Sequence, residues 1–143
     1  MARKPNAAKI RARIVASISR LPDARAVPIG EHMSLEVRKR RFGWFMADHH
    51  GDGRIAINCK VPALIAAQLS TSIPTQFHIP RYVGKRGWIG LWLDVPDIDW
   101  AQVDACLHEA YMAKAPKTLI EQLGVAAWGQ VLQACIPAGE LID

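Results

Sequence analysis

The sequence predicts an α+β fold with two layers, in which an antiparallel sheet of about four to six strands carries the N- and C-terminal helices on one face. Several short segments alternate apolar and polar residues and are joined by hairpin-like turns. Long segments of helical periodicity lie at both ends of this strand-rich region. Because strands and helices do not alternate regularly, an antiparallel sheet is favoured over a parallel one.

A single domain is expected from the length of 143 residues, half of them hydrophobic. We assign residues 1–124 to this α+β domain and residues 125–143 to a helical C-terminal extension or tail. No apolar run is long enough to span a bilayer, and the basic N-terminus lacks an apolar signal core, so a cytoplasmic location is expected. The three separate cysteines, Cys59, Cys106 and Cys135, are interpreted as small buried side chains.

The first third of the chain predicts a helix followed by a strand. Asn6 can cap a helix that runs to about Ser19 with its isoleucines on one stripe. An irregular link through Pro28 and Gly30 should follow. The alternation over residues 33–38 then predicts a strand with one solvated face.

A basic hairpin and a third strand come next. Residues 38–41, Arg-Lys-Arg-Arg, should form an exposed tip, because four adjacent cations resist burial. The second strand is expected from Phe42 to Asp48 and the third from Arg54 to Lys60, with glycines in the turn between them available for positive φ.

The segment from residue 62 to residue 81 predicts a short helix and a long loop. Pro62 is tolerated in the first turn of a helix, and Ala63 to Leu69 supplies apolar residues for it. Residues 70–81 contain two prolines, which cannot donate hydrogen bonds to a central strand. We therefore expect an extended loop there.

The stretch from Tyr82 to Val95 organises the rest of the chain. A tight turn over residues 84–87 leads into a strand whose aliphatic residues (Ile89, Leu91, Leu93 and Val95) face one way. The opposite face carries Trp88, Gly90, Trp92 and Asp94 beside two cations, Lys85 and Arg86. After this strand, Asp99 can cap a helix that Pro116 interrupts and that ends at Gly124.

Charge is distributed unevenly along the chain. Up to residue 41 there are 11 lysines and arginines against 3 acidic residues, a net +8, whereas the remainder carries 7 against 10, a net −3. Such segregation can create a field that attracts polyanions. The alternative interpretation is that these charged residues form solvated surfaces that keep the protein soluble.

Several of these segments resemble the MmcQ/YjbR family over roughly residues 8–122. The resemblance rests on Leu21-Pro22, the hairpin residues 42–45, Ala56 to Lys60, Tyr82 to Trp88, and Ala110-Tyr111. It implies a frataxin-like (CyaY-like) α+β fold, which has also been compared with a double-wing DNA-binding domain. The family's association with DNA binding follows from that comparison of folds.

Cations and aromatic rings give the candidate binding residues. Those expected to contact a nucleic acid or another anion are Arg11, Arg13, Arg38, Lys39, Arg40, Arg41, Lys60, Lys85 and Arg86. Those expected to stack on a ligand are Tyr82, Trp88 and Trp92. The alternative interpretation is that the rings cover the sheet and the cations are simply solvated.

Neither a catalytic constellation nor a cofactor or metal site is predicted. Residues 49–52, His-His-Gly-Asp, lack a third nearby protein ligand and are interpreted as a polar turn. The leading hypothesis is a non-enzymatic module that binds DNA or another polyanion with little sequence specificity, as a monomer or homodimer. The alternatives are a protein-interaction or self-association module that uses the tail, and a small-ligand site around Lys60, Tyr82 and Trp88.

Overall fold

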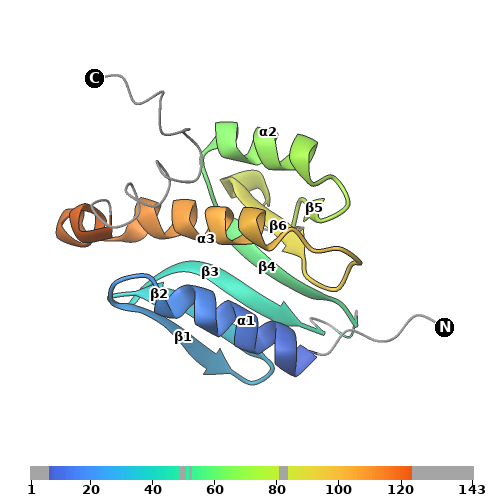
Figure 1. The fold of residues 1–143 in the computed structure, drawn as a ribbon, viewed down its shortest axis with the longest axis horizontal. Helices are drawn as coiled ribbons and strands as arrows, with labels where there is room; N and C mark the ends of the chain where they lie inside the picture. The colour runs from blue at the N-terminus through green and yellow to red at the C-terminus, as the bar shows by residue number, and fades with distance from the viewer. Residues whose placement is uncertain (1–6, 49–50, 52, 81–83, 124–143) are drawn as a thin grey trace, which may run out of the picture.

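The computed structural model of the protein describes residues 7–48, 51, 53–80 and 84–123. The elements, in chain order, are α1 (Ala7–Ser19), β1 (Ala24–Ile29), β2 (His32–Val37), β3 (Arg40–Ala47), β4 (Ile55–Lys60), α2 (Ala63–Ser72), β5 (Phe77–His78), the 3₁₀ helix η2 (Gly84–Arg86), β6 (Trp88–Trp92) and α3 (Trp100–Lys114). They form the predicted two-layer α+β fold, with the helices on one side of an antiparallel sheet (Figure 1).

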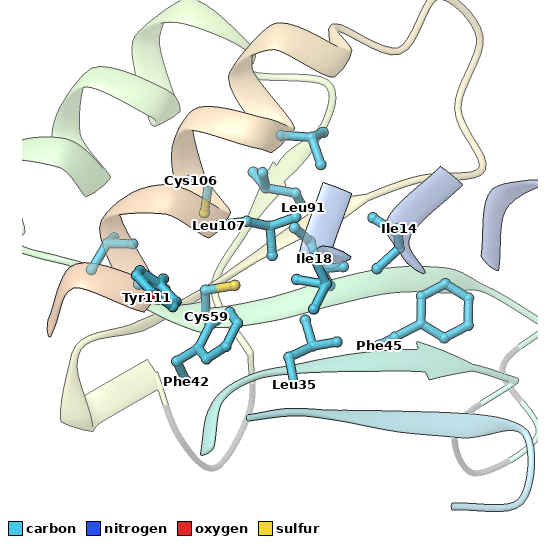
Figure 2. Close-up of a cluster of buried hydrophobic side chains, with 14 of the residues drawn as sticks. Ile14, Ile18, Leu35, Phe42, Phe45, Cys59, Leu91, Cys106, Leu107 and Tyr111 are labelled. Atoms are coloured by element: carbon cyan, nitrogen blue, oxygen red, sulfur yellow. The ribbon is translucent and has the colours of Figure 1, made fainter. Parts of the chain in front are cut away.

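The sheet contains six strands in the order β1-β2-β3-β4-β6-β5. Every neighbouring pair is antiparallel. The apolar residues of the four central strands point to the side covered by α1 and α3, as the period-2 pattern predicts. Leu35 and Leu91 are fully buried there (Figure 2), as is Ile57.

Helices α1 and α3 lie side by side on the sheet. Their buried residues, among them Ile14 and Ile18 of α1 and Leu107 of α3, recur at helical spacing and pack on the same core (Figure 2). Arg13 joins the helices, because its Nη2 lies 2.9 Å from Oδ2 of Asp104 and its guanidinium lies over the ring of Trp100.

Two strands lie where the sequence pattern predicts irregular chain. Residues 24–29, expected as a link, form edge strand β1, in which Pro28 opposes Met33. An edge position tolerates proline because one side of the strand needs no partner. Residues 70–81, expected as a loop, contain the end of α2 and the two-residue edge strand β5. Both differences arise from pairing across the sheet, which local periodicity does not report.

The C-terminal helix begins as predicted and is interrupted near Pro116, while its predicted end at Gly124 lies outside the described residues. The Asp99 side chain accepts a hydrogen bond from the backbone N–H of Gln102 at 3.2 Å, which caps α3. The helix stops at Lys114, Ala115 is extended, and residues 117–123 form a further helical segment after Pro116. The expected tail, residues 125–143, lies outside the described residues.

A β-bulge at Phe42 sets the direction of the side chains at the start of β3. Leu35 opposes Gly43 whereas Glu36 opposes Arg41, so Phe42 is the extra residue. Phe42 and Gly43 consequently both face the core, and glycine makes room because a Cβ at residue 43 would lie 3.1 Å from Sγ of Cys59. The bulge also turns Arg41 to the helix-free face and Arg40 toward the end of α3, where its Nη1 donates to the Lys114 carbonyl.

The Phe42 ring meets Tyr111 edge-on, with centroids 5.8 Å apart (Figure 2). The Tyr111 hydroxyl donates a 2.7 Å hydrogen bond to the carbonyl of Pro22, and burial raises the pKa of its phenol. Cys59 and Cys106 are buried free thiols, as expected. A hydrogen bond with Cys106, together with burial, raises the pKa of the Cys59 thiol well above its ordinary value. The Cys59 thiol and the Tyr111 phenol are therefore uncharged at neutral pH.

Candidate nucleic-acid interface

The face of the sheet opposite α1 and α3 is the candidate interface, and no helix of the described residues lies on it (Figure 1). Strand register aligns one row of residues across this face: Val27, Ser34, Trp44, Asn58, Gly90 and His78. Trp88 and Trp92 lie on either side of Gly90 along β6 and share its face. Three tryptophans are thus presented on the helix-free face, all of them half-buried.

Trp92 is enclosed by its neighbours. His78 stacks on the indole with centroids 3.8 Å apart, and the Arg54 guanidinium carbon lies 3.8 Å from the ring centroid. At these distances the two groups must occupy opposite faces of the ring. Gly90 allows this arrangement, since a Cβ there would overlap the His78 imidazole. Trp92, a predicted stacking residue, therefore has neither face open to a ligand.

Arg41 lies over the ring of Trp44. Its guanidinium carbon is 3.9 Å from the ring centroid, and its Nε donates a 2.8 Å hydrogen bond to Oγ of the buried Ser34. Among the described residues, no carboxylate pairs with Arg41, and its two Nη groups make no hydrogen bond. The outer plane of this exposed side chain and its Nη donors therefore remain available to a ligand.

Lys60 and Trp88 form the next part of the interface. They oppose each other in the β4-β6 register, so their side chains lie on the same face. The Lys60 Cε lies 3.8 Å from the position that a Cβ on Gly87 would occupy, which brings the Lys60 side chain alongside the turn that follows η2. Gly87 itself has φ +86°, which favours glycine at this turn.

Five exposed cations, which we call the basic rim, gather at one end of the sheet. Arg40 opposes Val37 at the β2-β3 turn, while the last residue of β4 opposes the first residue of β6. The chain has two basic bends, the β2-β3 turn and η2 before β6. They therefore project from the same end of the sheet, separated by two strand spacings, about 10 Å. The basic rim consists of Lys39, Arg40, Arg41, Lys60 and Arg86, none of which pairs with a described carboxylate.

Three other predicted cations are engaged elsewhere. Arg13 pairs with Asp104 and hydrogen-bonds to Ser17 between the helices, on the opposite side of the sheet from Trp44. Arg11, also on α1, donates to the carbonyl of Glu31. Arg38 is in the basic turn, but its Nε lies 3.0 Å from Oδ2 of Asp23. These residues are not part of the basic rim.

The structure does not describe the remaining predicted site residues. Tyr82 and the side chain of Lys85 lie outside the described residues, as do His49, His50 and Asp52 of the predicted polar turn. Within the described ranges, no group of three or more His, Cys, Asp or Glu side chains could hold a metal ion.

Charge in the folded protein is segregated along the strands. The end opposite the basic rim carries Glu31, Asp48, Asp94, Asp97 and Asp99. Helices α1 and α3 both begin at the acidic end and finish at the basic end, where the partial negative charge of their C-termini favours cations. This orientation stabilises part of the basic rim independently of any ligand.

Asn58, in the middle of this face, has a side-chain acceptor without a hydrogen-bond donor among the described residues. Its Oδ1 is buried without a hydrogen-bond partner among the described residues. Leaving a buried acceptor unpaired costs about 1–3 kcal/mol. A polar residue retained at such a cost next to Trp44 marks this part of the sheet as a candidate site.

Replacing Asn58 with valine is expected to leave the free energy of unfolding unchanged or to raise it by up to about 1 kcal/mol, because the unpaired amide is removed and valine suits a strand. Urea denaturation monitored by circular dichroism measures the change. A loss of more than about 1 kcal/mol would mean that the Asn58 amide stabilises the folded state.

Asp94 is ionised and firmly held at the acidic end. Its carboxylate accepts hydrogen bonds from Nε and Nη2 of Arg54 at 2.8 and 2.9 Å and from the backbone N–H of Ile55 at 2.9 Å. Burial opposes ionisation, but these hydrogen bonds outweigh it, so the pKa of Asp94 is lowered. The pair fixes the guanidinium that covers Trp92.

Asp94→Asn is expected to lower the free energy of unfolding by roughly 1–2 kcal/mol at pH 7, a modest value because Arg54 is partly solvated. Since the folded-state pKa lies below the unfolded one, the stabilisation is complete above the unfolded value, about pH 4, and disappears as the pH falls through the folded value. Denaturation curves of both proteins from pH 7 to acid should therefore converge. A difference independent of pH would contradict the assignment.

Sequence reasoning missed Trp44 and Asn58 as members of the interface. Trp44 precedes Phe45 in the predicted strand, so the period-2 pattern already indicates that the two side chains point to opposite faces of the sheet. The contact between Trp44 and Arg41 depends on the β-bulge, which the period-2 pattern does not predict. Asn58 is an ordinary solvent-facing position in the strand pattern, and only its buried, unpaired oxygen distinguishes it.

The fold and the site together define a two-layer α+β domain that presents cations and indole rings on the uncovered face of its sheet. No protein-family model and no curated protein matches the chain. Solved structures with the same fold include the following two. A Pseudomonas syringae protein, 12% identical, aligns over 72% of this chain and 97% of its own with a TM-score of 0.57. Deinococcus radiodurans DR2400, which has a DUF419 domain and is 17% identical, aligns over 78% and 85% with a TM-score of 0.58.

At these low sequence identities, the structural alignments show a common fold and nothing beyond it. The DUF419 domain is related to the YjbR/MmcQ family. Over the described residues, no helix combines the length and the apolarity needed to cross a membrane.

Proposed function

We propose that the protein is an MmcQ/YjbR-like module that binds nucleic acid through the basic rim and the adjacent helix-free face of the sheet. The observation that carries this proposal is the gathering of five exposed cations, none paired with a described carboxylate, at the end of the sheet where the helix-free face carries Trp44 and Trp88. We propose a cytoplasmic protein without catalytic activity, as a monomer or homodimer.

The arrangement of the cations supports a polymeric anion. The β2-β3 turn and η2 are separated by about 10 Å across the sheet, and Lys60 projects on the strand between them. A single phosphate group would contact one part of this rim, whereas a chain of phosphates can follow all of it. Rings next to such cations are typical of nucleic-acid surfaces, where bases stack as phosphates pair.

Binding to a nucleic acid should depend steeply on salt. If each of the five rim cations neutralises one phosphate of a single strand, the logarithm of the association constant falls with log salt at a slope of about −3.5. The affinity then falls about 100-fold when the salt concentration rises fourfold. Anisotropy of a fluorescent oligonucleotide, titrated at low and at moderate salt, measures this loss.

The absence of binding even at low salt would end the proposal. Binding that does not weaken with salt would also contradict it, since the rim would then not be contacting phosphates. Heparin as a competitor should displace the oligonucleotide, because the rim recognises charge and not base sequence.

A further inference from the structure

We infer that the preferred ligand is a single-stranded nucleic acid whose bases stack at two places on the sheet, on the Arg41 guanidinium and on Trp88. The inference rests on the proposed function and specifies which kind of nucleic acid it involves. Bases that are unpaired can lie flat on aromatic rings or on arginine planes, whereas those of a duplex are already stacked on one another.

The first stacking place is the Arg41-Trp44 pair. The guanidinium carbon lies 3.9 Å from the centroid of the Trp44 ring, and Ser34 accepts a hydrogen bond from its Nε, so two contacts hold the guanidinium in place before any ligand arrives. The Arg41 side chain is exposed, so the side of the guanidinium that Trp44 does not cover is accessible to solvent. A base can stack there while the two Nη groups donate to a phosphate of the same strand.

The second stacking place is Trp88. This half-buried indole opposes Lys60 and follows directly after Arg86 and Gly87, so a base on the ring has cations on either side for its flanking phosphates. No ring contact engages Trp88 among the described residues, in contrast to Trp92, which is covered on both faces. Asn58 lies on β4 between the two stacking places.

The helices are poorly placed for a duplex. Reading base pairs in the major groove requires a helix or a two-stranded ribbon to enter it. Arg11 and Arg13 of α1 are tied to Glu31 and Asp104, on the opposite side of the sheet from the stacking places. Arg41 and Lys60 instead share the helix-free face with Trp88, which suits a flexible strand.

The test compares three labelled probes: a thymidine single strand, an abasic strand of the same length, and a duplex. The abasic strand has the same phosphates but no bases, so the difference between the first two probes isolates stacking. We expect the thymidine strand to bind at least about 5-fold more tightly than the abasic strand and more tightly than the duplex. Trp88→Ala should lower thymidine affinity about 5- to 150-fold and leave abasic affinity nearly unchanged.

Arg41→Lys provides a second variant that does not disturb the core, because residue 41 is exposed. Lysine keeps the positive charge but lacks the planar guanidinium. Arg41→Lys should therefore also weaken binding of the thymidine strand and leave binding of the abasic strand unchanged. Trp100→Ala, the same substitution on the helix side, is the control and should leave all three affinities unchanged. Thermal melting of each variant verifies that it is folded.

The outcomes separate the two proposals. Equal affinity for the thymidine and abasic strands, or tighter binding of the duplex, would overturn the inference while leaving salt-dependent nucleic-acid binding in place. Failure to bind any of the three probes would remove the proposed function as well.

Discussion

Replacing Phe42 with alanine is expected to lower the free energy of unfolding by about 3–5 kcal/mol. Domains of this size are typically stable by only about 5–15 kcal/mol, so the loss would be a large part of the total stability. The ring is 1% exposed and packs edge-on against Tyr111, between the start of β3 and the end of α3 (Figure 2). Removing it opens a cavity at the place where the sheet and helix layers meet. Urea denaturation, or thermal melting if the variant is too unstable, measures the loss.

This prediction also tests the bulge. In a strand without it, residue 42 would lie on the same face as Trp44, and its truncation would cost little, as for most surface substitutions. Met46→Ala is the matched control, because Met46 is half-buried on the helix-free face of the same strand. It should cost less than half as much as Phe42→Ala. Similar costs for the two variants would show that Phe42 does not face the core.

Removing two cations of the basic rim, Arg41→Ala with Lys60→Ala, is expected to weaken binding to a single-stranded oligonucleotide roughly 10- to 100-fold at low salt. The salt slope should become shallower by about 1.4, because two phosphate contacts are lost. Both residues are exposed and lack acidic partners among the described residues, so the main cost to stability is the lost hydrogen bond between Arg41 and the buried Ser34, roughly 1–2 kcal/mol. Fluorescence anisotropy over a salt series measures both quantities.

The matched control removes the same number of charges from α1. Lys9→Ala with Arg11→Ala changes the net charge equally, but these residues lie near the N-terminal end of the helix, on the other side of the sheet. Affinity and salt slope should stay within about 3-fold and 0.3 of the original values, because no phosphate contact is lost. If both double variants weakened binding equally, attraction would depend on net charge and not on the rim.

The strands and helices that have their own periodicity could be predicted from the sequence. The alternation around Leu35, Ile57 and Leu91 identified the core side of the sheet, and the same alternation put Trp88 and Trp92 on the other side. Asp99 was identified as a helix cap because the capping interaction involves residues close in sequence. In each case the physical cause lies within a few residues of the signal.

The composition of the candidate site was only partly predictable. Residue type and closeness in the chain place nine cations in one predicted binding site. The fold divides the described ones among them into an exposed rim at one end of the sheet and residues such as Arg13 and Arg38, which are held by Asp104 and Asp23. Those partners are 91 and 15 residues away in sequence, so their charges cannot be paired by inspection of the sequence alone.

The sequence by itself determined the α+β class, the core face of each central strand and the presence of two basic bends, because each follows from local periodicity or composition. Only the tertiary structure decided which way those features point. The register of β2, β3, β4 and β6 brought the two bends to one end of the sheet, and a single extra residue at Phe42 turned Arg41 onto Trp44. Hydrogen bonds between strands fix register and bulges, and they join residues that the sequence keeps apart.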